Sequence, residues 1–190
     1  MARLDRIHGL GETRKLTRGS TVCIAVPSLK LFEQLKDART VLNSFGIANE
    51  VCIVAAHWAP KKTLRLIAEL ESKQVEVIIA AADGSAHLPG MIASLTTIPV
   101  IGVPLQGTSL QGMDSLLSIV QMPHGVPVAT MAINSGYNAG VFACQILSLK
   151  YPHLKERLIQ HKEMLEKQVE SEDIRFNRKL VHARHRKHVL

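Results

Sequence analysis

The feature that most constrains the fold of this 190-residue chain is a repeated alternation between short apolar runs and helical patterns. The apolar runs recur about every 25 residues, a spacing that leaves room for one helix between consecutive strands. Strands that alternate with helices in this way predict βαβ units, and therefore a parallel sheet with right-handed crossovers. We expect one α/β domain, with no internal repeat and no low-complexity linker.

The predicted elements follow that alternation along the whole chain. The expected strands are residues 21–26, 49–55, 75–81, 98–103 and 126–131. The expected helices are residues 29–45, 61–70, 89–95, 114–120 and 137–149, and then a long charged helix from about residue 153 to residue 172. The first helix, for example, has apolar residues at steps of three and four, and Gly46 follows as its stop.

Composition indicates an aliphatic core and gives no sign of a membrane segment. Hydrophobic residues make up 46% of the chain and aromatic residues only 4%. The longest apolar runs fall well short of the about 18 residues that a membrane-spanning helix needs, and the first 20 residues lack the apolar stretch of a signal peptide. We therefore expect no membrane partner and a location in the cytoplasm or an organelle matrix.

The three cysteines, Cys23, Cys52 and Cys144, are widely spaced, and each lies inside an apolar run. Their spacing matches no metal-binding pattern, and their number is odd. We expect three free thiols in a reducing compartment and no metal site.

The formal net charge of +7 belongs to the two ends of the chain. Residues 1–20 hold five Lys/Arg and two acids, and residues 171–190 hold six Lys/Arg and two acids, so the residues between them are neutral overall. We expect a basic N-terminal arm at residues 1–20 and a basic, His-rich tail at residues 173–190. These ends suit contact with nucleic acid or an acidic partner, and the alternative is a solvated extension without a partner.

The stretch AAADGSAHLPGM, residues 80–91, follows the apolar run of the third predicted strand. Its small residues suit a loop whose backbone lies close to a ligand. Residues 26–28 and 55–58 stand at the ends of two other predicted strands. Ligands of open α/β sheets bind outside the carboxyl ends of the strands, so we expect the three loops to meet around one site.

Four segments of the sequence form a specific pattern: SAHLPGM at 85–91, IPVIGVP at 98–104, GMDSLLSIVQMP at 112–123 and the small-residue pattern at 138–147. These segments resemble the PurE family of purine biosynthesis, which comprises 5-aminoimidazole-ribonucleotide carboxylases and carboxyaminoimidazole ribonucleotide mutases. The resemblance covers about residues 21–168. It implies a flavodoxin-like, three-layer α/β/α sandwich at residues 21–150 and a C-terminal helix at residues 151–172 that packs on neighbouring subunits of a homo-octamer.

The resemblance also implies a carboxyl shift without a metal or an organic cofactor. Carbon dioxide leaves the exocyclic amine of an aminoimidazole ribonucleotide and is recaptured at ring carbon C4. One histidine, here His57, is the implied general acid/base, since imidazole titrates near neutral pH. The residues implied to bind substrate are Ser28, Ala82, Gly84, Ser85, His87 and Leu88.

The three loops also depart from the family pattern. The first family loop reads Gly-Ser-x-Ser-Asp, and only Ser28 is kept, with Leu31 in place of the aspartate that holds ribose. The second reads Ser-Ala-His-Arg-Thr-Pro, and Trp58 replaces its phosphate-binding arginine. In the third, Asp83 replaces a glycine and adds a carboxylate beside the expected substrate carboxyl group.

Three hypotheses therefore stay open. The first is a working mutase or carboxylase with a divergent phosphate site. The second is a pseudoenzyme, an octameric scaffold whose basic termini bind RNA or an acidic partner. The third is a changed ligand, with Trp58 stacked on a base and Asp83 accepting from a donor group. A structural role is the alternative for the two histidines, with His87 forming hydrogen bonds inside its own loop.

Overall fold

The computed structural model describes residues 21–107 and 110–187, and within them the side chains from Val22 to Asn177. The chain divides into two compact units, with the boundary after Leu147. The first unit holds the sheet and its helices, and the second holds one long helix. The predicted N-terminal arm, residues 1–20, lies outside the described residues.

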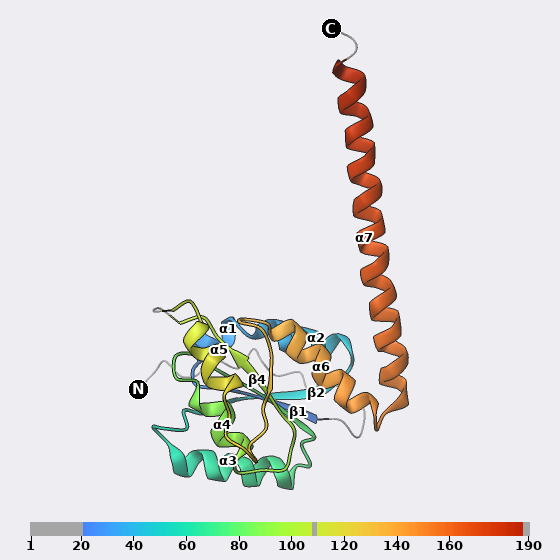
Figure 1. The fold of residues 1–190 in the computed structure, drawn as a ribbon. Helices are drawn as coiled ribbons and strands as arrows, with labels where there is room; N and C mark the ends of the chain where they lie inside the picture. Colours follow the sequence, from blue (N-terminus) through green and yellow to red (C-terminus); the bar gives the residue numbers. More distant parts are fainter. Residues whose placement is uncertain (1–20, 108–109, 188–190) are drawn as a thin grey trace, which may run out of the picture. The chain divides into compact units, whose positions relative to one another are not determined.

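The sheet has five parallel strands in the order β2-β1-β3-β4-β5. This is the strand order of the flavodoxin-like fold, as predicted. Figure 1 shows the sheet with its helices. The strands are β1 (Thr21–Val26), β2 (Ala48–Ile53), β3 (Val77–Ala82), β4 (Val100–Pro104) and β5 (Ala129–Thr130).

The central strands are buried on both faces. All six residues of β3, VIIAAA, are buried, and so are all five residues of β4. A strand covered by helices on both sides has no solvent face, and its sequence is therefore a continuous apolar run without alternation. The side chains of β3 also become smaller toward its carboxyl end, where three alanines lie next to the site.

Helices cover both faces of the sheet and confirm the three-layer sandwich. One core cluster joins the strands to α3 through Ile67, to α4 through Ile92 and to α5 through Ile119. On the other face, α2 and α6 approach so closely that a Cβ at Gly140 would lie 3.0 Å from the Val41 Cβ. Figure 1 shows α3 and α4 on one side of the sheet and α2 and α6 on the other. The helices are α1 (Leu29–Glu33), α2 (Lys36–Ser44), α3 (Pro60–Ser72), α4 (His87–Ala93), α5 (Met113–Val120) and α6 (Gly136–Ser148).

The single helix predicted at residues 29–45 is wrong, because two helices, α1 and α2, occupy this segment. The break lies at Leu35, which is completely buried, while the N–H groups of Gln34 and Leu35 bond three residues back. Gly136 of α6 packs on Leu35, and a Cβ there would lie 3.1 Å from its Cδ1. Because the Leu35 side chain is buried in the core, the backbone forms three-residue hydrogen bonds here, and α2 begins at the next residue.

The fifth strand is also shorter than predicted. Residues 126–131 were expected to pair, but only Ala129 and Thr130 form β5. Pro127 lies in this segment and has no N–H to give to a ladder. The Met131 N–H still bonds to the Gly102 carbonyl at 2.9 Å, so the pairing stops within one residue of β5.

The last helix, α7 (Pro152–Lys187), is 36 residues long. It includes all but the first residue of the helix predicted at residues 151–172 and most of the tail predicted at residues 173–190. Within the described residues, no helix is both long enough and apolar enough to cross a membrane.

Candidate functional site

The loop after β1 turns directly into α1 at Ser28. The Ser28 backbone is extended, and its hydroxyl oxygen accepts from the Leu31 N–H at 3.3 Å, so Ser28 is the N-cap of α1. Pro27 precedes it and has no N–H to offer a ligand. Leu31 is buried, with 8% of its surface exposed, so the position of the family's aspartate has joined the core.

The loop after β2 presents His57 on a tight turn. The Ala55 carbonyl accepts from the N–H groups of Trp58 and Ala59, at 3.1 and 2.9 Å. Ala56 is buried beneath this turn, and His57 is exposed above it. Trp58 is 83% exposed, and its ring meets the His57 imidazole edge-on with centroids 5.3 Å apart.

The loop after β3 reaches α4 through two left-handed residues, Gly84 (φ 58°) and Ala86 (φ 43°). Glycine suits the first because it adopts this conformation without strain. The Ala86 N–H closes the turn on the Asp83 carbonyl at 3.1 Å, and His87 then begins α4. The turn leaves the Asp83 side chain exposed.

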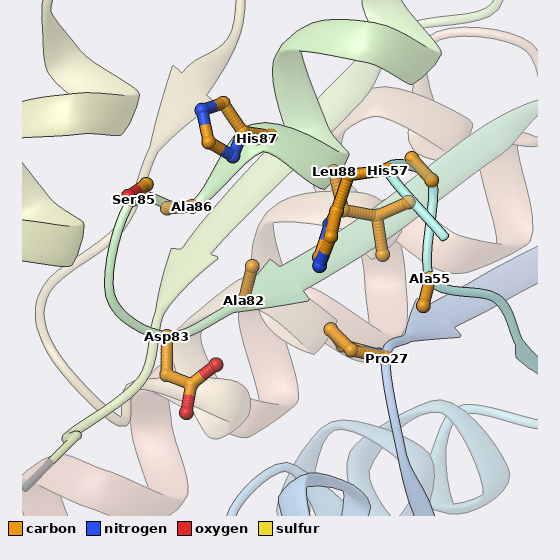
Figure 2. A pocket seen from close by; sticks show the side chains of 10 residues that line it. Pro27, Ala55, His57, Ala82, Asp83, Ser85, Ala86, His87 and Leu88 are labelled. Carbon is orange, nitrogen blue, oxygen red and sulfur yellow. The ribbon is translucent and has the colours of Figure 1, made fainter. Parts of the chain in front are cut away.

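The three loops enclose one cavity of about 350 Å³. Figure 2 shows its lining side chains gathered at the ends of β1, β2 and β3. Five of the seven predicted site residues line it, namely His57, Ala82, Ser85, His87 and Leu88. Gly84 lies in the same loop but is not part of the lining. The other lining residues are Pro27, Ala55, Ala56, Asp83 and Ala86.

The two histidines are the polar groups of this cavity best suited to proton transfer. Their rings come from different loops, and their centroids lie 6.2 Å apart. The floor between them is small and apolar, since Ala82 and Leu88 are both buried. The arrangement can hold a small planar ring with an imidazole at its edge.

A second cavity, of about 510 Å³, adjoins the first and shares Asp83 with it. Ser28, the remaining predicted site residue that lines a cavity, lies here. The other lining residues are Lys30, Leu31, Gln34, Gln106, Gly107 and Asn134. Asn134 is fixed by the Gln106 backbone, whose N–H donates to its Oδ1 at 2.9 Å.

Four residues that line the second cavity were not among the predicted site residues, namely Gln34, Gln106, Gly107 and Asn134. Gln106 and Gly107 follow β4, and Asn134 follows β5, so the rule that ligands bind at carboxyl ends of strands could have found them. Gln34 gave no such signal, because its position depends on the unpredicted break between α1 and α2. Its Oε1 is buried and has no hydrogen-bond partner among the described residues.

The described residues contain no group of three or more His, Cys, Asp or Glu side chains that could hold a metal ion. The polar side-chain groups that line the two cavities are imidazole, carboxylate, amide and hydroxyl groups and one ammonium group.

Comparison with known proteins places this geometry in a family. Residues 21–168 match the pattern of the family described as AIR carboxylase. Over 136 residues the chain is 48% identical to the N5-carboxyaminoimidazole ribonucleotide mutase of Pyrococcus horikoshii, covering 72% of this chain and 77% of that one. It is 50% identical over 135 residues to the mutase of the same name from Thermotoga maritima, covering 71% and 79%.

The fold is similar to that of solved PurE structures. The crystal structure of Treponema denticola PurE superposes with a TM-score of 0.76 at 22% identity, and the match covers 82% of this chain and 97% of that one. The family match spans most of the first unit, including all three loops of the cavity. The chain therefore belongs to the AIR carboxylase (PurE) family of purine biosynthesis.

Proposed function

We propose that the chain binds an aminoimidazole ribonucleotide across its two cavities and moves a carboxyl group on it, more weakly than its relatives do. The observation that carries the proposal is the position of His57 at the edge of a small cavity with an apolar floor. The relatives named as N5-carboxyaminoimidazole ribonucleotide mutases support the ligand class.

In the proposed reaction, His57 is the general acid/base. The carbon–nitrogen bond to the carboxyl group breaks, a proton goes to the exocyclic amine, and carbon dioxide stays in the cavity. A carbon–carbon bond then forms at ring carbon C4, and the proton on C4 returns to the imidazole. Ala82 and Leu88 favour this step, because an apolar floor holds carbon dioxide without hydrating it.

The second cavity suits the ribose and phosphate. Lys30 supplies a positive charge for the phosphate, although as a point charge without the fork geometry of arginine. The buried Gln34 Oε1, without a partner among the described residues, suits a donating ribose hydroxyl. Asn134 and Gln106 add amide groups to the lining of the same cavity.

Two residues support weakened turnover. Asp83 lines both cavities, so its carboxylate adds a negative charge close to a bound carboxylated ligand. Trp58 stands where the family has an arginine, and 83% of its surface is exposed, so no phosphate donor replaces the guanidinium there. A second candidate follows from the same residues, namely a scaffold that binds the nucleotide without turning it over.

We also propose that the chain forms a homo-octamer, as the resemblance implies. The supporting observation is an apolar row on α5 and the loop before it, in which Leu110, Met113, Leu117 and Val120 are each at least half exposed. Within α5, the spacing of Met113, Leu117 and Val120 places these three residues on one side of the helix. A row of this kind in a soluble chain commonly marks a contact with another protein.

The experiment that tests the function uses the purified full chain. Binding of aminoimidazole ribonucleotide and of its two carboxylated forms is measured by calorimetry, and interconversion of the carboxylated forms is followed by absorbance. Binding with slow conversion supports the proposal, and binding without conversion supports the scaffold. A well-folded octamer that binds none of the three contradicts both.

A further inference from the structure

Helix α7 separates its charges into two consecutive segments. The acidic segment, residues 163–173, has one base, Lys167, and five acids: Glu163, Glu166, Glu170, Glu172 and Asp173. The basic segment, residues 175–187, has no acid and six bases: Arg175, Arg178, Lys179, Arg184, Arg186 and Lys187. Both segments belong to the same continuous helix, so the sign of the net charge changes from negative to positive along its axis.

Apolar residues continue along one side of this helix and are exposed. Leu154, Leu165 and Phe176 are spaced by eleven residues, as are Leu158 and Val169. An eleven-residue repeat keeps its positions on one face of a nearly straight helix. Leu154 and Leu158 are buried, but Leu165, Val169 and Phe176 are 43%, 67% and 59% exposed.

We propose that residues 163–187 of α7 pair with the same residues of a second copy of this chain, in antiparallel orientation. An antiparallel pair centred near residue 174 sets each acidic segment against a basic segment. A parallel pair would set acid against acid and base against base, which is repulsive along its whole length. The apolar residues then lie in the seam between the two helices.

Charge complementarity selects this partner over nucleic acid. A polyanion would be attracted by the basic segment but repelled by the acidic segment that adjoins it on the same helix. Pairing with a second copy places each segment opposite a segment of the other charge. Every described side chain from Lys162 to Asn177 is exposed, so this surface is uncovered in the single chain. Residues 169–187 lie beyond the family match, and the pairing is independent of the function proposed for the cavity.

Distances between spin labels on two copies test the orientation. The half-buried Cys52 is first replaced by alanine, which leaves Cys23 and Cys144 buried. One cysteine is then introduced, either as Ser171→Cys or as Gln160→Cys, and labelled with a nitroxide. At a rise of about 1.5 Å per residue, the antiparallel pair separates the two labels along the axis by about 9 Å at position 171 and about 42 Å at position 160.

The expected result is a short distance at position 171 and a much longer one at position 160. Equal distances at the two positions indicate a parallel pair and overturn the proposal. The absence of any intermolecular distance in the range of the experiment at position 171 also overturns it.

Charge-reversal variants test the cause of the pairing. The acidic set is Glu163→Lys, Glu166→Lys and Glu170→Lys, and the basic set is Arg178→Glu, Lys179→Glu and Arg184→Glu. Each set alone should remove the short distance at position 171, and the two sets together should restore it. If the combined variant does not restore it, charge complementarity is not the cause and the proposal fails.

Gel-shift titration of the same variants with a single-stranded RNA tests the other partner. RNA binding that disappears in the basic set, while the distance at position 171 stays unchanged, assigns the basic segment to RNA and overturns the proposal.

Discussion

The imidazole rings of His57 and His87 lie with their centroids 6.2 Å apart, although one belongs to the loop after β2 and the other begins α4 after β3. They meet because β2 and β3 flank β1 on either side in a parallel sheet, so their carboxyl ends share one edge. His57 stands on a turn held by backbone hydrogen bonds, and that turn fixes the backbone position from which its ring extends. The pair therefore offers two proton-carrying groups around one small cavity.

Replacing His57 should remove turnover and leave ligand binding nearly intact. His57→Asn keeps a polar side chain of similar width but carries no titratable proton. We expect kcat to fall by about 10²- to 10⁴-fold, the usual contribution of a general acid/base, with a small change in KM. His87→Asn is the matched control and should change KM more than kcat. Equal losses of kcat in the two variants would contradict the assignment of His57 alone.

Replacing Gln34 should weaken the binding of ribonucleotides but not the binding of the free base. Gln34→Leu removes a buried oxygen that has no partner among the described residues, so the free energy of unfolding should stay the same or rise slightly. Affinity for aminoimidazole ribonucleotide should fall about fivefold, the value of one hydrogen bond of about 1 kcal/mol. Affinity for a base without ribose should not change. Calorimetry measures both, with the exposed Glu33→Gln as control, and equal losses for both ligands would count against the ribose contact.

Much of this site could be predicted from the sequence because it depends on local patterns. Strand ends follow from apolar runs, and ends of parallel strands share an edge, so the positions of His57, Ser85 and His87 needed no tertiary detail. Gln34 could not be predicted in this way. Its place depends on Leu35 turning into the core against Gly136, a contact between distant parts of the chain that helical periodicity does not contain.

The short fifth strand and the long last helix show the same limit. The run at residues 126–131 is apolar enough for a strand, but Pro127 and the edge position leave only two residues paired. The high charge of residues 173–187 predicts a solvated tail, yet high charge does not oppose helix formation when Lys, Arg, Leu and Ala supply good helix propensity.

Gly102 should be intolerant of a methyl group. A Cβ at Gly102 of β4 would lie 2.6 Å from the Ile119 Cγ2 and 2.6 Å from the Val128 Cγ1, and both atoms belong to stiff β-branched side chains. We expect Gly102→Ala to lower the free energy of unfolding by about 1–3 kcal/mol, measured in urea. Gly90→Ala is the control. Its Cβ would meet only the Met122 thioether, which can rotate away, so a loss as large as that of Gly102→Ala would contradict this account.

The Cys23–Cys52 pair should react unequally with alkylating reagents. A hydrogen bond with Cys23 lowers the pKa of the Cys52 thiol, whereas that same bond and burial raise the pKa of Cys23 far above its usual range. At pH 8 more of Cys52 is therefore thiolate, and iodoacetamide should modify Cys52 first. Cys23→Ala removes the donor, which raises the pKa of Cys52 and should slow its alkylation.

Cys23→Ser keeps a donor at the same place and serves as the control for that experiment. Its Cys52 should react at close to the rate in the unchanged chain, as followed by mass spectrometry of peptides. If alanine and serine slow Cys52 equally, or if Cys23 reacts first, the hydrogen bond does not set the order.

Asp83 should discriminate against carboxylated ligands. Its carboxylate is exposed and lies between the two cavities, so water screens it and its repulsion of a second carboxylate is near the solvent value, about 1 kcal/mol at 4 Å. Asp83→Asn removes the charge with little change in shape. We expect its affinity for carboxyaminoimidazole ribonucleotide to rise about fivefold, because 1.4 kcal/mol corresponds to a factor of ten. Affinity for the uncarboxylated nucleotide should rise less, because only the phosphate is then repelled. The gain in affinity of Asp83→Asn over the unchanged chain should shrink between 0.05 and 0.5 M salt, about the range over which exposed charges become screened.

Asp83→Ala separates the effect of the charge from that of the hydrogen bonds of the new amide. It should behave as Asp83→Asn does if the charge is the cause. Equal gains for both nucleotides in calorimetry would mean that Asp83 opposes the phosphate and not the carboxyl group, and would remove it as a reason for slow carboxyl transfer.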